Sequence, residues 1–164
     1  MRDSLTAFAQ HFPEPLAVML LAALPITELR FSIPFAVQVF DMRIPQAFIW
    51  SVIGNILPVP FILVLLGPVT MWAENHWAGL HRFLDRLFAH SRRRHTARFD
   101  RLRDVALITF VAIPLPITGA WSGALAAFVF GVEPRRATAL ISIGVVIAGL
   151  IVSALTAAGI ALLS

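Results

Sequence analysis

The 164-residue chain contains no cysteine and no lysine, and charged residues make up only 13% of it. Without cysteine it forms no disulfide, no thiolate metal site and no cysteine nucleophile. Charge is missing altogether from three long stretches, residues 46–73, 105–132 and 137–163. A helix needs about 20 apolar residues to cross the roughly 30 Å hydrocarbon core of a bilayer, and each stretch exceeds that length. The sequence therefore predicts an all-α integral membrane protein, with one transmembrane domain over residues 1–164.

Enzyme motifs and cofactor sites are also absent from the sequence. It has no phosphate-binding loop, no nucleophile elbow and no pair of acids placed for catalysis. The four histidines between residues 76 and 95 lack the spacing of a metal site. We therefore expect a protein that is not an enzyme and that binds neither a metal nor a cofactor.

Eight of the 13 arginines lie close together, beside the second uncharged stretch. Basic residues next to membrane spans are typically retained in the cytoplasm. We therefore expect the segment that carries them, residues 74–104, to be a cytoplasmic connector and not a nucleic-acid-binding surface. Its apolar residues recur at helical spacing, which is typical of a helix lying on a membrane surface. The eight are Arg82, Arg86, Arg92, Arg93, Arg94, Arg98, Arg101 and Arg103.

The sequence repeats itself. The run Leu-Pro-Ile-Thr at residues 24–27 recurs at residues 115–118, and further matches follow in the same order at a nearly constant offset. Each half has a broken apolar stretch, then a charged turn (41–43 or 133–136), then a long apolar helix. We interpret this pattern as a duplication, with a first repeat at about 14–73 and a second at about 105–164.

The broken stretch of the first half predicts a re-entrant helical hairpin. Its arms, 16–24 and 31–40, would each reach about 15 Å, half of the bilayer core. The second stretch, 105–132, either folds back in the same way or crosses as one kinked helix, and both interpretations stay open. Proline and glycine interrupt helices, and the expected breaks in both halves are Pro25, Pro34, Pro58, Pro60, Pro114, Pro116, Gly119 and Gly123.

Two hairpins would give each repeat one membrane crossing, with the halves in opposite orientations, as in transporters built from inverted repeats. The connector would then be cytoplasmic, and both termini would lie on the other side. The alternative is four full transmembrane helices, with the connector and both termini in the cytoplasm.

Glu28 and Arg30 are the candidate functional residues of the first break. Ionisable groups at membrane depth are costly and are commonly paired or functional. Desolvation favours the neutral form of a carboxyl group, so Glu28 is a candidate for binding and releasing a proton. Arg30 could neutralise Glu28 or hold an anionic headgroup. The alternative is a pair at the membrane interface that only positions the hairpin.

Further candidates for a substrate or proton pathway are Thr118, Trp121 and Ser122 in the second break, and Asn55 beside Pro58. Thr118 and Ser122 offer hydroxyl groups, and Trp121 offers a large ring. Helix packing is the alternative role for Asn55 and for the small-residue pair Gly119 and Gly123.

These segments resemble the small multidrug export family. The resemblance rests on residues 24–30 with 33–34, and on 54–61, 112–124 and 144–149. It implies a multi-pass protein of the bacterial inner membrane that transports an amphipathic small molecule or a lipid. We expect Glu28 to couple this transport to protons. The expected partners are the lipid bilayer and the substrate, and association into a homo-oligomer stays open.

The family is similar in turn to the DedA/VTT membrane proteins, which have two facing re-entrant hairpins and are linked to lipid flipping or scrambling. Their hairpin acid corresponds to Glu28. Their second hairpin typically carries arginine, whereas residues 114–131 of this chain contain none. A lipid flippase or scramblase is therefore one alternative function. A structural or regulatory membrane protein without a transport cycle is another.

Overall fold

The computed structural model describes residues 12–76, 97–115 and 118–163, and within these ranges all regular elements are α-helices, as expected. The first half contains α2 (Glu14–Ala23), α3 (Glu28–Val39), α4 (Ile44–Ile56) and α5 (Pro58–His76). The second half contains α7 (Ala97–Ala112), α8 (Ala120–Val129) and α9 (Pro134–Leu163).

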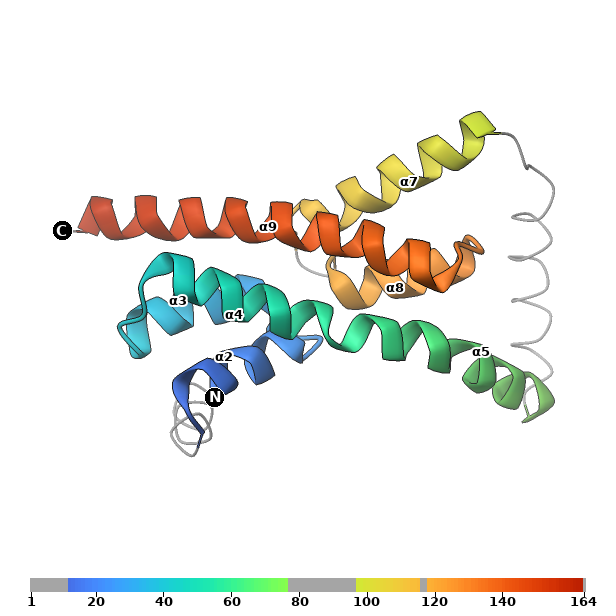
Figure 1. Ribbon diagram of the computed structural model, residues 1–164, viewed down its shortest axis with the longest axis horizontal. Coiled ribbons are helices and arrows are strands. Elements are labelled where there is room, and N and C mark those ends of the chain that lie inside the picture. The colour runs from blue at the N-terminus through green and yellow to red at the C-terminus, as the bar shows by residue number, and fades with distance from the viewer. Residues whose placement is uncertain (1–11, 77–96, 116–117, 164) are drawn as a thin grey trace.

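Helices α2 and α3 fold back on one another and both pack against α4 (Figure 1). Helix α2 ends at Ala23, just before Pro25, whose ring disfavours a helical conformation in the preceding residue. The chain turns over residues 24–27, and α3 then runs to Val39. We expected Pro34 to break this helix, but in the structure it lies inside α3. Its neighbours Ile33 and Ala36 are fully buried, and their packing offsets the hydrogen bond that Pro34 cannot make.

Helices α4 and α5 follow one another along one line, separated at Leu57. Pro58 begins α5, where the missing N–H would have no helical partner in any case. Pro60 lies in the first turn of α5 for the same reason, and so it does not form a second break.

The stretch 105–132 forms two helices, not one kinked helix. Helix α7 ends at Ala112, helix α8 begins at Ala120, and the two pack against each other. Pro114 and Gly119 lie between them, whereas Gly123 lies inside α8, at the contact with Val111. The expected charged turn at 133–136 falls at 130–133, because Pro134 is a favourable first residue for α9.

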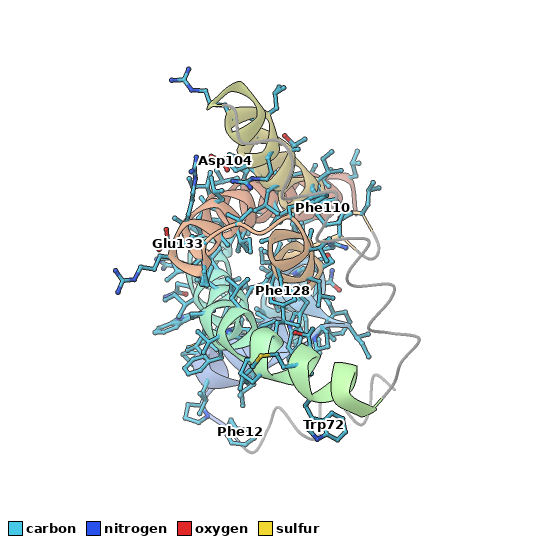
Figure 2. All side chains as sticks on the ribbon, turned by 90° about the vertical axis from the view of Figure 1, so that its right-hand side faces the viewer. Phe12, Trp72, Asp104, Phe110, Phe128 and Glu133 are labelled. Carbon is cyan, nitrogen blue, oxygen red and sulfur yellow. The ribbon has the colours of Figure 1, made fainter. Side chains whose placement is uncertain are left out.

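The two long helical segments run in opposite directions, and the turns of the α2–α3 and α7–α8 pairs lie close together near the middle of the molecule (Figure 1). Helix α9 packs against α3, α4, α5, α7 and α8, and so it connects the two halves. Asp104 on α7, which is labelled in Figure 2, forms an ion pair with Arg136 in the first turn of α9.

Two segments are long and apolar enough to cross a membrane, Ile44–Trp72 and Pro134–Leu162, each of 29 residues. Only 33% of the most apolar window of each is buried inside the protein. A core helix of a soluble domain would be mostly covered, whereas these helices present apolar side chains outward, among them Phe61, Leu65, Leu150 and Leu155. Trp72, near the end of α5, also lies at the outer edge of the molecule.

Close packing between α2 and α4 depends on Gly54. A methyl group there would lie 2.6 Å from the Cα atom of Met19, a backbone atom that cannot move aside on its own. We expect Gly54→Ala to lower the free energy of unfolding by about 2 kcal/mol, as overpacking commonly does. Gly67→Ala is the matched control, because its methyl group would meet nothing within 4 Å. Denaturation in detergent measures both, and equal stability of the two variants would contradict the close contact.

Candidate functional site

The turns of the two helix pairs contact each other directly through long-range hydrogen bonds. The Arg30 guanidinium donates to the Leu115 carbonyl and, over 3.2 Å, to the Thr118 hydroxyl. From the opposite side, the Trp121 indole N–H donates to the Ala23 carbonyl over 2.9 Å. This last bond satisfies one of the carbonyls that the end of α2 leaves without a helical partner. A side chain of each helix pair thus binds a backbone carbonyl of the other pair.

Glu28 lies at the centre of this contact. It is the first residue of α3, it is only 7% exposed, and its backbone has the positive φ of 44° that residues other than glycine rarely adopt. Its carboxylate lies against Gly119, where the backbone N–H groups of Ala120 and Trp121, the first residues of α8, stabilise its negative charge. Such groups have no partner within their own helix, and the helix dipole favours a negative charge beside them. Glu28 therefore caps a helix of the other half.

Gly119 makes this close approach possible. A Cβ atom at this position would collide with the carboxylate of Glu28. The sequence alone ascribed to Gly119 a break or a packing contact. In the structure it provides the space in which the Glu28 carboxylate reaches the start of α8.

Arg30 is the more accessible member of the charged pair. Its guanidinium nitrogen Nη2 lies 3.6 Å from Oε2 of Glu28, and its side chain is 23% exposed against 10% for Glu28. Both charges are therefore paired, but only the cation presents substantial surface to its surroundings.

The two threonines of the repeated Leu-Pro-Ile-Thr motif have similar local roles. The Thr27 hydroxyl donates to the Leu21 carbonyl near the end of α2. The Thr118 hydroxyl lies 2.7 Å from the Ile113 carbonyl, which follows the end of α7. Each side chain thus binds back to the chain just before its own turn, as threonine commonly does in turns.

A pocket of about 770 Å³ opens beside these contacts. Its walls are mainly apolar, and its charged groups are those of Glu28 and Arg30. A second pocket of about 420 Å³ lies between α3 and the end of α9, and it shares Arg30 and Pro114 with the first. The first pocket is lined by Pro25, Ile26, Thr27, Glu28, Arg30, Phe31, Pro114, Thr118, Trp121, Ser122 and Leu125.

Five of the six candidate pathway residues, all but Asn55, line this first pocket. Asn55 is instead buried in the last turn of α4, with 1% exposure. Pro116 lies outside the described residues. Thr27, Phe31 and Leu125 also line the pocket, although the sequence did not single them out. Thr27 could have been found as the counterpart of Thr118 in the repeat.

The basic connector lies largely beyond the part of the chain that the structure describes. Arg82, Arg86, Arg92, Arg93 and Arg94 fall within residues 77–96. Arg98, Arg101 and Arg103 belong to α7, and Arg103 donates a hydrogen bond of 3.1 Å to the Phe130 carbonyl. In the described ranges, no group of three or more histidine, aspartate or glutamate side chains is placed to hold a metal ion.

The model of the family described as "Putative small multi-drug export protein" matches residues 28–151 of the chain. No curated protein and no solved structure matches the chain. The matched region includes Glu28 and Arg30, the turn between α7 and α8, and the turn between α8 and α9. Together with the two long apolar helices, this match identifies a helical membrane protein that belongs to the small multi-drug export family.

Proposed function

We propose that this protein transports an amphipathic small molecule across the bacterial inner membrane, and that the pocket between the two turns binds the substrate. One observation carries the proposal: a buried acid and a partly exposed arginine, from one helix pair, bind the other helix pair at the rim of an apolar pocket. Charged groups are rarely placed within apolar helical segments unless they are paired or functional. The pocket also has the volume of a small-molecule site, about 300–1,000 Å³.

The proposed architecture is an inverted repeat of two re-entrant hairpins, α2–α3 and α7–α8, each followed by a crossing segment. Helices α2 and α8 have 10 residues each, so each is about 15 Å long, half of the bilayer core. The opposite directions of α4–α5 and α9 support this arrangement. In this topology the basic connector is cytoplasmic, and both termini lie on the other face.

The substrate that fits best is an amphipath with a negatively charged headgroup. Arg30 is the accessible charge of the pocket, and guanidinium groups hold carboxylates and phosphates with two parallel hydrogen bonds. Glu28 is largely covered, and the N–H groups at the start of α8 already stabilise its charge. The apolar wall would receive the hydrocarbon part of the ligand.

A proton on Glu28 would supply the coupling. Protonation removes the negative charge that holds the start of α8 and neutralises Arg30. Arg30 would then be free to bind an anion, so uptake of a proton and of the substrate would favour each other. This mechanism uses the residues of the chain alone, without a cofactor and without chemical conversion of the substrate.

A lipid flippase or scramblase, similar to the DedA proteins, is the second candidate function. The second pocket favours it, because this space continues from Arg30 along the exposed apolar face of α9. An acyl chain could lie there while the headgroup reaches Arg30.

Proteoliposomes separate these functions. We expect the purified protein to move an anionic fluorescent amphipath and to leave the sidedness of fluorescent phospholipids unchanged. Loss of lipid sidedness would favour the flippase, and no movement of either probe would favour a structural or regulatory protein.

Arg30→Gln is expected to weaken binding of the anionic amphipath at least tenfold, which corresponds to the loss of one charge-assisted contact of about 1.5–3 kcal/mol. Arg43→Gln is the matched control, because Arg43 is exposed at the start of α4, outside both pockets. Fluorescence titration of the purified protein measures both variants. Equal weakening by the two substitutions would show that overall charge, and not the pocket, binds the ligand.

A further inference from the structure

A buried polar contact shows the register between α3 and α4. The hydroxyl groups of Ser32 and Ser51 are 2.8 Å apart, and both side chains are fully buried. The two helices are joined by a short turn and run in opposite directions. One helical turn from this contact, in the same direction, lie Glu28 on α3 and Asn55 on α4. Each is four residues from its serine, and so each lies on the same face of its helix as that serine.

The side chain of Asn55, opposite Glu28, has a hydrogen-bond acceptor without a partner. Its side chain is 99% buried, and its Oδ1 atom has no hydrogen-bond partner. An acceptor left unpaired in the interior is costly, and such groups are rare in native structures. A charged carboxylate cannot satisfy it because it has no proton to donate. A protonated carboxyl group can.

We propose that Glu28 and Asn55 together form a proton-binding site, in which the O–H of the protonated Glu28 donates to Oδ1 of Asn55. The proton comes from solvent, and no covalent bond between heavy atoms changes. The charged and the neutral forms of Glu28 then have different partners. The charged form binds the N–H groups at the start of α8, and the neutral form binds α4 within its own half of the molecule.

Few other charges act on this site. Helices α2, α4 and α9 pack against α3. Helix α4 contains no charged residue, α2 has only Glu14 at its first position, and α9 has charges only in its first turn, at Arg135 and Arg136. Helix α8, whose start Glu28 caps, has none. Among the described residues, Arg30 is therefore the charged side chain that faces Glu28.

The consequence for transport rests on the proposed function. Transfer of Glu28 from α8 to Asn55 would remove the buried charge from the contact between the two helix pairs. That contact would keep the hydrogen bonds of Arg30 and Trp121, but it would lose the interaction of the Glu28 carboxylate with the start of α8. Proton binding would thus be linked to separation of the two turns.

Infrared difference spectroscopy of the purified protein in lipid tests the site without any substrate. A pH titration shows the carbonyl band of protonated carboxyl groups, and Glu28→Gln identifies the band of Glu28. In Asn55→Leu, which keeps the branched shape of the side chain and removes the acceptor, we expect this band to move to higher frequency. We also expect its midpoint pH to fall by about 1 unit, because a bond to the neutral form is lost.

Ser51→Ala is the matched control, because it removes a buried hydroxyl one helical turn from Asn55 and leaves the Asn55 acceptor in place. It should leave both the band and its midpoint unchanged. Asn55→Ala is the second variant if the leucine does not fit, and the same shift is expected of it. An unchanged band and midpoint in a folded Asn55 variant would overturn the proposal, as would an equal shift in Ser51→Ala. Failure of transport would not affect the titration, so the two proposals fail separately.

Discussion

Glu28→Gln is expected to reduce transport at least tenfold while the protein is still made, inserted and folded. Glutamine keeps the shape of the side chain and can accept one N–H bond from the start of α8. It cannot carry the charge that pairs with Arg30, and it cannot exchange a proton. Charge-assisted hydrogen bonds are each worth about 1.5–3 kcal/mol, and a tenfold change needs only about 1.4 kcal/mol. Uptake of the fluorescent amphipath into proteoliposomes measures the effect.

Asp41→Asn is the control for this loss. Asp41 is exposed in the turn between α3 and α4, and its backbone has a φ of 51°, which asparagine adopts readily. This variant should transport like the parent protein. Full transport by Glu28→Gln would refute the role of the charge. A loss that only follows the amount of folded protein would refute it as well.

Gly119→Ala is expected to have the second largest effect, because its methyl group would collide with the Glu28 carboxylate. The carboxylate must then leave the N–H groups of Ala120 and Trp121. We expect transport to fall at least tenfold and the free energy of unfolding to fall by about 1–3 kcal/mol. Gly67→Ala on α5, whose methyl group would meet nothing within 4 Å and which lines neither pocket, is the matched control.

A double-mutant cycle tests the cause of this effect. In the Glu28→Ala background the carboxylate is absent, so Gly119→Ala should cost less stability than in the parent protein. If its cost is the same in both backgrounds, the methyl group does not act through Glu28.

The helical elements could largely be predicted from the sequence, because their signals are local. The uncharged stretches predicted the two long apolar segments, and the repeated Leu-Pro-Ile-Thr motif indicated the position of the turn in each helix pair. Pro34 misled the prediction because tertiary packing around Ile33 and Ala36 overrides its local preference. Glycine in the second turn was ambiguous for a similar reason: Gly119 precedes a helix and Gly123 lies within it, and only the packing distinguishes them.

The chemistry of the site could be predicted only in part. Glu28 and Arg30 were recognisable because charge is rare in apolar stretches. Their partners were not, since Leu115, Ala120 and Trp121 are some 90 residues away in the sequence. The burial of Asn55 beside the Ser32–Ser51 contact depends on the register of α3 against α4, which no local pattern specifies.

The side of the membrane on which each end of the chain lies tests the two-hairpin arrangement most directly. Because the chain has no native cysteine, Ser91→Cys and Ser164→Cys each give a single reporter. In intact cells, an impermeant thiol reagent should label Ser164→Cys, and it should label Ser91→Cys only after lysis. Protection of both positions in intact cells would place the C-terminus in the cytoplasm with the connector, and would contradict the account.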